Sequence, residues 1–295
     1  MKLLLNGEIV EENEAVIPVS DHGFLYGMGL FETFRTYGGK PWLLERHAAR
    51  LGAGLRELGI AYEPDAARMR EALARLLAAN GMTDAYVRWS VSAGSEILGL
   101  PSGTYRRPAE IVHVKELAPD KPGTRAAKTL RLLKLRRSGP ENGSFRLKSF
   151  HFMNNILAKR ELAAAGAGPG TEGLFLNGVG HVCEGIVSNV FWLRGGILFT
   201  PSLECGPLPG ITRGFVLEMA AGFGVEVREG AFRLDDLARA DEVFMTNSVQ
   251  EIVPVNLLEN EAGEPIGRFR SDEAGSLTRQ WMAAYRAQAE KGEAR

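Results

Sequence analysis

Apolar residues recur at intervals of three and four in two segments near the start of the chain. The first segment, 44–58, has them at Leu44, Ala48, Leu51, Leu55 and Leu58. The second, 66–79, has them at Met69, Leu73, Leu76 and Leu77. This spacing places the apolar side chains on one face of a helix, so both segments are predicted to be amphipathic helices.

Strands are expected around this helix pair. Asn6-Gly7 separates two short apolar runs, and this dipeptide favours a two-residue hairpin turn. The glycine-rich stretch 23–29 is interpreted as a tight turn that leads into a strand. The strands expected in this part of the chain cover residues 2–5, 8–10, 30–37, 85–91 and 110–114.

The remainder of the chain mixes helices and strands without strict alternation. Helices are expected over 150–165, 212–221 and 271–288, and strands over 129–135, 173–176, 189–193, 225–228 and 242–246. The segment 118–123 contains Pro119, Pro122 and Gly123, and these residues indicate a linker. We therefore predict a smaller N-terminal α/β domain at 1–118, a linker at 119–124 and a larger domain at 125–295. The expected fold class is mixed, α+β or α/β, with mixed sheets.

Length and composition narrow the range of functions. A chain of 295 residues with 45% hydrophobic and 24% charged residues is of ordinary globular composition. The net charge of −1 gives no general attraction to nucleic acid, and no apolar run approaches a membrane span. Two cysteines imply no disulfide framework, so the cytoplasm is the expected compartment. The five histidines are scattered, so no metal site is expected.

One lysine stands in an apolar setting. Lys148 directly precedes the helix expected at 150–165, and its neighbours include Phe145, Leu147 and Phe150. These neighbours indicate partial burial, which lowers the pKa of a lysine. A lysine held neutral in this way can form a Schiff base with a carbonyl group. The alternative is a solvated charge, which is the commoner role of a lysine before a helix.

A carboxylate and two turns could serve the same chemistry. Glu184, in an otherwise apolar stretch, is either a turn residue at a strand end or a carboxylate that holds a pyridine nitrogen protonated. Gly210-Ile211-Thr212 opens an expected helix, where free backbone N–H groups favour a phosphate. Thr246-Asn247-Ser248 ends a buried strand and offers further donors. Each turn is a weak signal alone, because a threonine at a helix start is usually only an N-cap.

Taken in order, these features resemble the fold-type IV pyridoxal-phosphate enzymes, which include branched-chain and D-amino acid aminotransferases and 4-amino-4-deoxychorismate lyases. The matching pieces are Asp21-His22-Gly23, Phe31-Glu32, His47-x-x-Arg50-Leu51, Lys148, Glu184-Gly185-x-x-Ser188-Asn189-Val190-Phe191, Gly210-Ile211-Thr212-Arg213, Thr246-Asn247-Ser248 and Glu251-Ile252-x-Pro254. The resemblance implies the two-domain D-amino acid aminotransferase-like fold, pyridoxal 5′-phosphate as cofactor, and a homodimer.

The resemblance also assigns roles to matching residues. Lys148 is then the Schiff-base lysine and the acid/base at the substrate carbon, and Glu184 is the partner of the pyridinium nitrogen. Arg50 is then the phosphate-binding arginine, although a surface helix arginine is the simpler interpretation. The other implied cofactor contacts are Gly210, Ile211, Thr212, Asn247 and Ser248.

Within the family, residues 21–35 and 144–161 are most similar to the bacterial aminodeoxychorismate lyases. This similarity implies conversion of 4-amino-4-deoxychorismate to 4-aminobenzoate and pyruvate, a step toward folate. Branched-chain aminotransferases usually carry a tyrosine shortly after the lysine, where this chain has Phe152 and Met153. D-amino acid aminotransferases carry an arginine and a histidine in the loop that here spans 92–99. Both differences favour the lyase, and a class IV aminotransferase of either type is the alternative.

The substrate of such a lyase has two carboxylates, which arginine side chains are suited to bind. The candidate substrate contacts are Phe31, Arg35, Arg88 and Arg146, although each arginine can also be a surface residue. A non-catalytic protein that keeps the fold is a further alternative. The presence of Lys148, Glu184 and Arg50 argues against it. The expected partners are a small-molecule substrate and a second copy of the chain, without nucleic acid or membrane.

Overall fold

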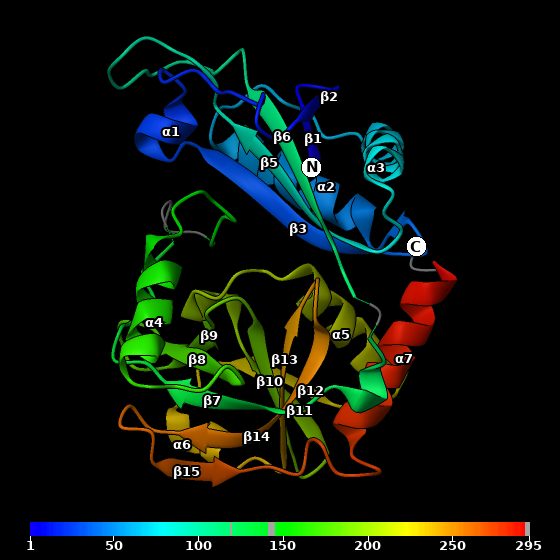
Figure 1. Ribbon diagram of the computed structural model, residues 1–295. Coiled ribbons are helices and arrows are strands. Elements are labelled where there is room, and N and C mark those ends of the chain that lie inside the picture. Colours follow the sequence, from blue (N-terminus) through cyan, green and yellow to red (C-terminus); the bar gives the residue numbers. More distant parts are fainter. Residues whose placement is uncertain (119, 141–144, 293–295) are drawn as a thin grey trace. The chain divides into compact units, whose positions relative to one another are not determined.

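The chain forms two compact units, each with its own sheet (Figure 1). The computed structural model describes residues 1–118, 120–140 and 145–292. Residues Met1–Pro119, Leu147–His151 and Ala289–Arg295 form the first unit, and Asp120–Arg146 and Phe152–Gln288 form the second. Pro119 of the predicted linker, Ser144 before Lys148, and the last three residues of the predicted larger domain lie outside the described residues. The predicted domain limits stay a prediction.

The first unit contains an antiparallel sheet with strand order β2-β1-β6-β5-β3-β4. Its strands are β1 (Lys2–Leu5), β2 (Glu8–Glu11), β3 (Gly29–Tyr37), β4 (Lys40–Pro41), β5 (Ala85–Ser92) and β6 (Ala109–Glu116). The predicted hairpin is confirmed, because β1 and β2 pair around Asn6 and Gly7, whose φ angles are 50° and 87°. A two-residue turn with positive φ at both positions matches the twist of the strands.

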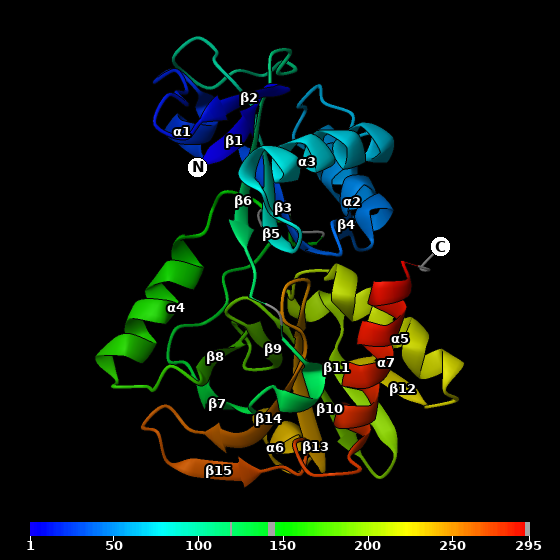
Figure 2. The same cartoon turned by 45° about the vertical axis from the view of Figure 1, so that its right-hand side comes forward.

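Two helices cover one face of this sheet (Figures 1 and 2). They are α2 (Leu44–Glu57) and α3 (Ala66–Asn80), and both confirm the sequence prediction. Their apolar stripes are buried against alternate residues of β3, β5 and β6. The cluster includes Leu51, Leu55, Met69, Leu73, Leu30, Phe34, Val87, Trp89 and Val112.

Two predictions about local structure are wrong. The glycine-rich stretch 23–29 is not simply a turn, because it holds most of a one-turn helix, α1 (His22–Tyr26). The Asp21 side chain accepts hydrogen bonds from the backbone N–H groups of Gly23 and Phe24 at the start of this helix. Gly27, with a φ of 71°, ends the helix. The helix predicted to start at residue 150 starts three residues later, as α4 (Met153–Ala164). Residues 147–151 are instead an extended segment of the first unit.

The second unit contains a nine-stranded sheet with order β12-β11-β10-β13-β14-β7-β8-β9, and β15 pairs with β14. Its strands are β7 (Lys128–Leu132), β8 (Thr171–Leu176), β9 (Val182–Gly185), β10 (Asn189–Arg194), β11 (Ile197–Pro201), β12 (Val227–Gly230), β13 (Glu242–Asn247), β14 (Glu251–Glu259) and β15 (Pro265–Arg268). Three neighbouring pairs are parallel and the others antiparallel, so the expected mixed sheet is confirmed.

Several helices accompany this sheet. Besides α4 they are α5 (Ile211–Gly222), α6 (Leu234–Ala238) and α7 (Leu277–Lys291), with 3-10 turns at Pro122–Thr124 and Leu203–Cys205. Inward-facing residues of the strands, among them Leu130, Leu174, Val190, Trp192 and Val243, form the main apolar cluster. Within the described parts of the chain, no helix has the length and apolar character needed to cross a membrane.

Candidate active site

Lys148 lies on the extended segment that pairs with the start of β3. Its carbonyl oxygen accepts a hydrogen bond from the backbone N–H of Phe31 at 2.9 Å, and Leu30 faces Ser149 across the two chains. The lysine is half-buried, as the sequence predicted, and its Nζ lies 4.7 Å from the centre of the Phe31 ring. Backbone pairing, rather than a helix start, therefore fixes the position of Lys148.

A guanidinium lies against the same ring. The Cζ atom of Arg88, on β5, is 3.6 Å from the centre of Phe31, because strand pairing puts both residues on one face of the sheet. Burial lowers the pKa of Arg88, and Tyr86 partly offsets that effect. The guanidinium nevertheless stays charged over the physiological range. Phe31, Lys148 and Arg88 are thus brought together within the first unit.

The other two arginines predicted to contact substrate have different surroundings. Arg35 follows on the same face of β3, is 5% exposed and lies 4.6 Å over the ring of Tyr37. Arg146, in the second unit, donates from Nε to the carbonyl oxygen of Gly206 at 2.9 Å and from Nη2 to that of Ser138. Two of the nitrogen atoms of the Arg146 guanidinium, Nε and Nη2, therefore donate to backbone carbonyl oxygens.

A buried carboxylate joins β3 to α2. Glu32, which is 1% exposed, accepts hydrogen bonds from Nε of Arg50 at 2.8 Å and from its Nη2 at 2.6 Å. The other partner is Nδ1 of His47, at 2.6 Å. The two-pronged contact with Glu32 fixes the orientation of the Arg50 guanidinium.

These contacts decide the charges in the group. Burial raises the pKa of Glu32, but Arg50 and then His47 outweigh it, and the pKa falls to about 2. Burial lowers the pKa of His47, and Arg50 and Lys148 add to this effect against the opposing influence of Glu32. At neutral pH the group therefore consists of a carboxylate, a guanidinium and a neutral imidazole that donates its Nδ1–H to Glu32.

In the second unit, Glu184 lies in strand β9 and is 4% exposed. Its Oε1 accepts a hydrogen bond from Nε of Arg137 at 2.7 Å, and its Oε2 accepts the backbone N–H of Leu208 at 2.9 Å. Arg146 adds a second positive charge, with Nε 3.6 Å from Oε1. The interpretation of Glu184 as a turn residue at a strand end is therefore wrong, because it is a buried strand carboxylate between two arginines.

Arg137 is in turn held by two amides. Its Nη1 donates to Oδ1 of Asn154 at 2.9 Å and to Oδ1 of Asn155 at 3.0 Å, both at the start of α4. These contacts orient the guanidinium towards Glu184. No sequence pattern indicated this role, since Arg137 and Glu184 lie 47 positions apart in the chain.

The start of α5 is arranged to bind an anion. Gly210 is the N-cap, and no side chain caps the helix, so the first backbone N–H groups have no intrahelical acceptor. The hydroxyls of Thr212 and Ser248 lie 3.3 Å apart. A Cβ atom at Gly210 would lie 2.1 Å from Oδ1 of Asn189, so this close approach requires glycine. Such a helix start favours a phosphate group.

Asn247 uses its side chain within its own turn. Its Oδ1 accepts the N–H groups of Val249 and Gln250 at 3.0 and 2.7 Å, and its Nδ2 donates to Oε1 of Gln250 at 3.2 Å. The structure therefore shows Asn247 shaping the turn that carries Ser248. The adjacent Thr246 hydroxyl is buried and has no hydrogen-bond partner among the described residues.

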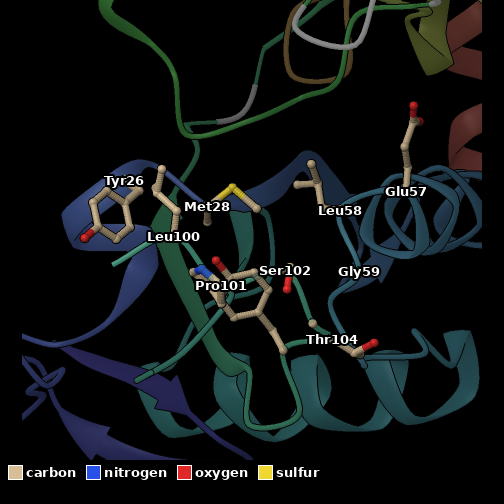
Figure 3. Close-up of a pocket in the computed structure, with 11 residues that line it drawn as sticks. Tyr26, Met28, Glu57, Leu58, Gly59, Leu100, Pro101, Ser102 and Thr104 are labelled. Carbon is tan, nitrogen blue, oxygen red and sulfur yellow. The ribbon is translucent and has the colours of Figure 1, made fainter. Parts of the chain in front are cut away.

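Other candidate sites do not coincide with these residues. A cavity of about 490 Å³ in the first unit is lined by parts of 26–28, 57–59 and 100–105, including Tyr26 and Leu100, and by none of the predicted site residues (Figure 3). Burial raises the pKa of the Cys183 thiol, which opposes a nucleophilic role. No three His, Cys, Asp or Glu side chains among the described residues are grouped to hold a metal ion.

Comparison with known proteins identifies the family. The family described as amino-transferase class IV matches residues 29–258, which include every candidate site residue described in this subsection. The chain belongs to the class IV aminotransferase family. The ordered motifs from Phe31-Glu32 to Glu251-Ile252 all lie within this match.

Members of the class IV family resemble this chain over nearly its whole length. The aminodeoxychorismate lyase of Bacillus subtilis is 45% identical over 259 residues, 87% of this chain and 86% of the relative. The crystal structure of 4-amino-4-deoxychorismate lyase from Pseudomonas aeruginosa is 30% identical, with a TM-score of 0.81 over 98% of this chain and 99% of that one. The branched-chain aminotransferase of the archaeon Thermoproteus uzoniensis, solved with norvaline, is 27% identical, with a TM-score of 0.84 over 99% and 96% of the two chains. These similarities confirm the predicted fold-type IV architecture.

Proposed function

We propose that this protein is a pyridoxal-phosphate-dependent 4-amino-4-deoxychorismate lyase, which converts its substrate to 4-aminobenzoate and pyruvate. The observation that carries the proposal is the 45% identity to the Bacillus subtilis aminodeoxychorismate lyase over 87% of the chain. The candidate residues agree with it, because Lys148, Glu184 and the start of α5 supply the three kinds of contact that this cofactor needs.

The residues present fit pyridoxal 5′-phosphate. The uncapped start of α5 and the hydroxyls of Thr212 and Ser248 would hold the phosphate, with Arg50 as the arginine that the family resemblance assigns to it. Glu184 would face the ring nitrogen. Each of its oxygens accepts one short hydrogen bond, and a carboxylate oxygen has room for two. Lys148 would carry the cofactor covalently.

When bound, the cofactor supplies a protonated pyridine ring that withdraws electrons from the amine-bearing carbon of the substrate. Lys148 accepts the proton from that carbon. Glu184 holds the proton on the ring nitrogen, and Arg137 stabilises the negative charge of Glu184. Arg88, which contacts the same Phe31 ring as Lys148, binds a substrate carboxylate. The C–O bond to the enolpyruvyl group breaks with its electron pair on oxygen, and the departing enolpyruvate takes up a proton and becomes pyruvate. The ring left behind is aromatic, so these residues need only orient the substrate and pass a proton from the carbon to the leaving group.

Two positions favour the lyase over an aminotransferase. Phe152 and Met153 follow the lysine where branched-chain aminotransferases have a tyrosine, and neither side chain offers a hydroxyl. The loop over 92–99 contains neither arginine nor histidine, which D-amino acid aminotransferases use there. Both features leave the protein without groups that its transaminating relatives use.

The decisive experiment compares the two reactions on one preparation. Purified protein loaded with pyridoxal 5′-phosphate should release 4-aminobenzoate from 4-amino-4-deoxychorismate with no 2-oxo acid added. D-alanine and leucine should exchange their amino group with 2-oxoglutarate slowly at best. If amino transfer is fast and 4-aminobenzoate release is absent, the lyase proposal is wrong and the aminotransferase is correct.

We also propose that the protein is a homodimer. Within the first unit, the loop 93–105 exposes three large apolar side chains, Ile97 (76%), Leu98 (82%) and Leu100 (89%). Exposed apolar side chains gathered in one loop are typical of an interaction surface. A second copy of the chain is the partner that the family resemblance implies.

The cytoplasm is the proposed compartment. Both cysteines, Cys183 and Cys205, are buried free thiols. Sparse, unpaired cysteines are typical of proteins kept in a reducing environment.

A further inference from the structure

Lys128, the first residue of β7, connects the buried Glu172 to the half-buried Gln250 within the second unit. Its Nζ donates to Oε1 of Gln250 at 3.1 Å and lies 3.6 Å from Oε2 of Glu172. The Lys128 side chain is 20% exposed and that of Glu172 only 3%. Strand β7 lies between β14 and β8 in the sheet, so its first residue can reach the turn before β14 and the start of β8.

One end of this connection is the turn that carries Ser248. The Oε1 atom of Gln250 accepts two hydrogen bonds, one from Nζ of Lys128 and one from Nδ2 of Asn247. Asn247 then accepts the backbone N–H groups of Val249 and Gln250, which closes the turn around Ser248. The conformation of this turn decides where the Ser248 hydroxyl lies relative to Thr212.

The other end is firmly anchored. Oε1 of Glu172 accepts the backbone N–H of Val187 at 3.1 Å and the hydroxyl of Ser188 at 3.4 Å. These residues form the turn that directly follows Glu184 and Gly185. Because Glu172 is fixed to this turn independently of Lys128, it serves as the anchor and Lys128 as the link.

We propose that Lys128 is a positioning residue for the cofactor phosphate. Lys128 acts through Gln250 and Asn247 on Ser248, the residue proposed to contact the phosphate. The inference rests on the proposed function, since it presupposes that Ser248 contacts the phosphate. A charged donor forms a stronger hydrogen bond than a neutral one, so the Lys128 ammonium, held by the buried Glu172 and bonded to the half-buried Gln250, restricts the turn more tightly. Removing the Lys128 ammonium leaves the Ser248 hydroxyl in the protein, but the turn that carries this hydroxyl can then adopt other conformations.

The test uses Lys128→Met, which keeps the length of the side chain and removes its charge. Lys134→Met is the matched control, because Lys134 is an exposed lysine just after the same strand. The probes are pyridoxal 5′-phosphate and pyridoxal, which differ only in the phosphate. Lys128→Met should weaken binding of pyridoxal 5′-phosphate roughly tenfold, the lower end of the loss seen when a group that orients a metal ligand is removed. Pyridoxal binding should be unchanged within error, and the phosphorus NMR signal of the bound phosphate should shift.

A second variant separates positioning from general destabilisation. Lys128→Met leaves the buried Glu172 without its lysine, so Lys128→Met/Glu172→Gln should recover the lost thermal stability but not the lost affinity for the phosphorylated probe. Equal weakening of both probes, or unchanged affinity with an unshifted phosphorus signal, would overturn the role of Lys128. If the unaltered protein binds neither probe, the proposed function itself fails.

Discussion

At the scale of single residues, the partners of each charged side chain decide what it can do. Arg146 and Arg137 both lie against Glu184, whereas Arg88 and Lys148 share the ring of Phe31. The first pair therefore stabilises a carboxylate within the second unit. In the second pair, the guanidinium of Arg88 is the charge that suits an anionic substrate, and Lys148 is the neighbour that shares its contact with Phe31.

Lys148→Ala should abolish covalent attachment of the cofactor. The unaltered protein, incubated with pyridoxal 5′-phosphate and reduced with borohydride, should carry a stable label on the peptide that contains Lys148. Peptide mass spectrometry measures this directly. A label of equal yield on another lysine, or in the Lys148→Ala variant, would contradict the assignment of Lys148.

Glu184→Gln should retain the cofactor but lose activity on the order of a hundredfold, the usual loss when one electrostatic contact to the reacting system is removed. The amide keeps the shape of the side chain but cannot hold a proton on the ring nitrogen. Steady-state kinetics with a titration of bound cofactor separates the two effects. Near-normal turnover with full cofactor occupancy would show that Glu184 does not have this role.

Arg88→Met should raise KM for the substrate more than it lowers kcat, because a carboxylate contact made equally in the ground and transition states affects binding. We expect a change in kcat/KM of roughly 10–100-fold, as for loss of a hydrogen bond to a charged group. Arg35→Met is the control on the same sheet face. A larger effect from Arg35→Met would shift the carboxylate contact to that residue.

At the scale of elements, Glu32 joins β3 to α2 by a buried carboxylate that is bound to Arg50 and His47. The pairing adds a charged connection to the apolar contacts between the strand and the helix. It also makes the attachment of α2 depend on the ionisation of one group.

The unfolding free energy should therefore fall in acid through Glu32. Its folded-state pKa, about 2, lies below the ordinary value of 4.5. The contribution is thus fully present above pH 4.5 and is lost as pH falls towards 2, and its size is on the order of 3 kcal/mol. Urea titrations at about pH 6 and about pH 3, on either side of the ordinary carboxyl pKa, should show a smaller pH effect in Glu32→Gln than in the unaltered protein. An equal effect in both would contradict this linkage.

The sequence predicted the elements with clear periodicity and missed those without it. The stripe of α2 and the Asn6-Gly7 hairpin were predicted correctly because local spacing and turn chemistry define them. β14 was not predicted, and it contains Pro254, which cannot donate to a strand ladder. The contact between Arg137 and Glu184 joins residues 47 positions apart, so no local pattern could indicate it. Lys148 and Glu184 were proposed from their apolar surroundings and the order of motifs, and their side-chain neighbours are seen only in the structure.

At the scale of the whole molecule, each of the two units carries some of the candidate residues. The first carries Lys148, Arg88 and Arg50, and the second carries Glu184 and the start of α5. The first also carries the exposed apolar loop that we propose as a surface for a second copy.

Replacing Ile97 and Leu98 by Ser should shift the protein from dimer to monomer, because it removes two large apolar side chains from the proposed contact. Light scattering at several concentrations measures the change. Val179→Ser is a control, since Val179 is 68% exposed but lies in the second unit. A monomeric unaltered protein, or a dimer that the loop variant leaves intact, would exclude this loop as the interface.

The extended segment 147–151 belongs to the first unit although the chain reaches it only after entering the second. During translation, β3 therefore leaves the ribosome long before the segment that pairs with it. Domains generally fold in the order of their synthesis, so the nascent first unit folds with one flank of β3 still open. A chain released early, before residue 148, can form most of that sheet and its helices but lacks Lys148, the amine proposed to bind the cofactor. Incomplete translation products of this protein are therefore unable to capture an aldehyde through this lysine.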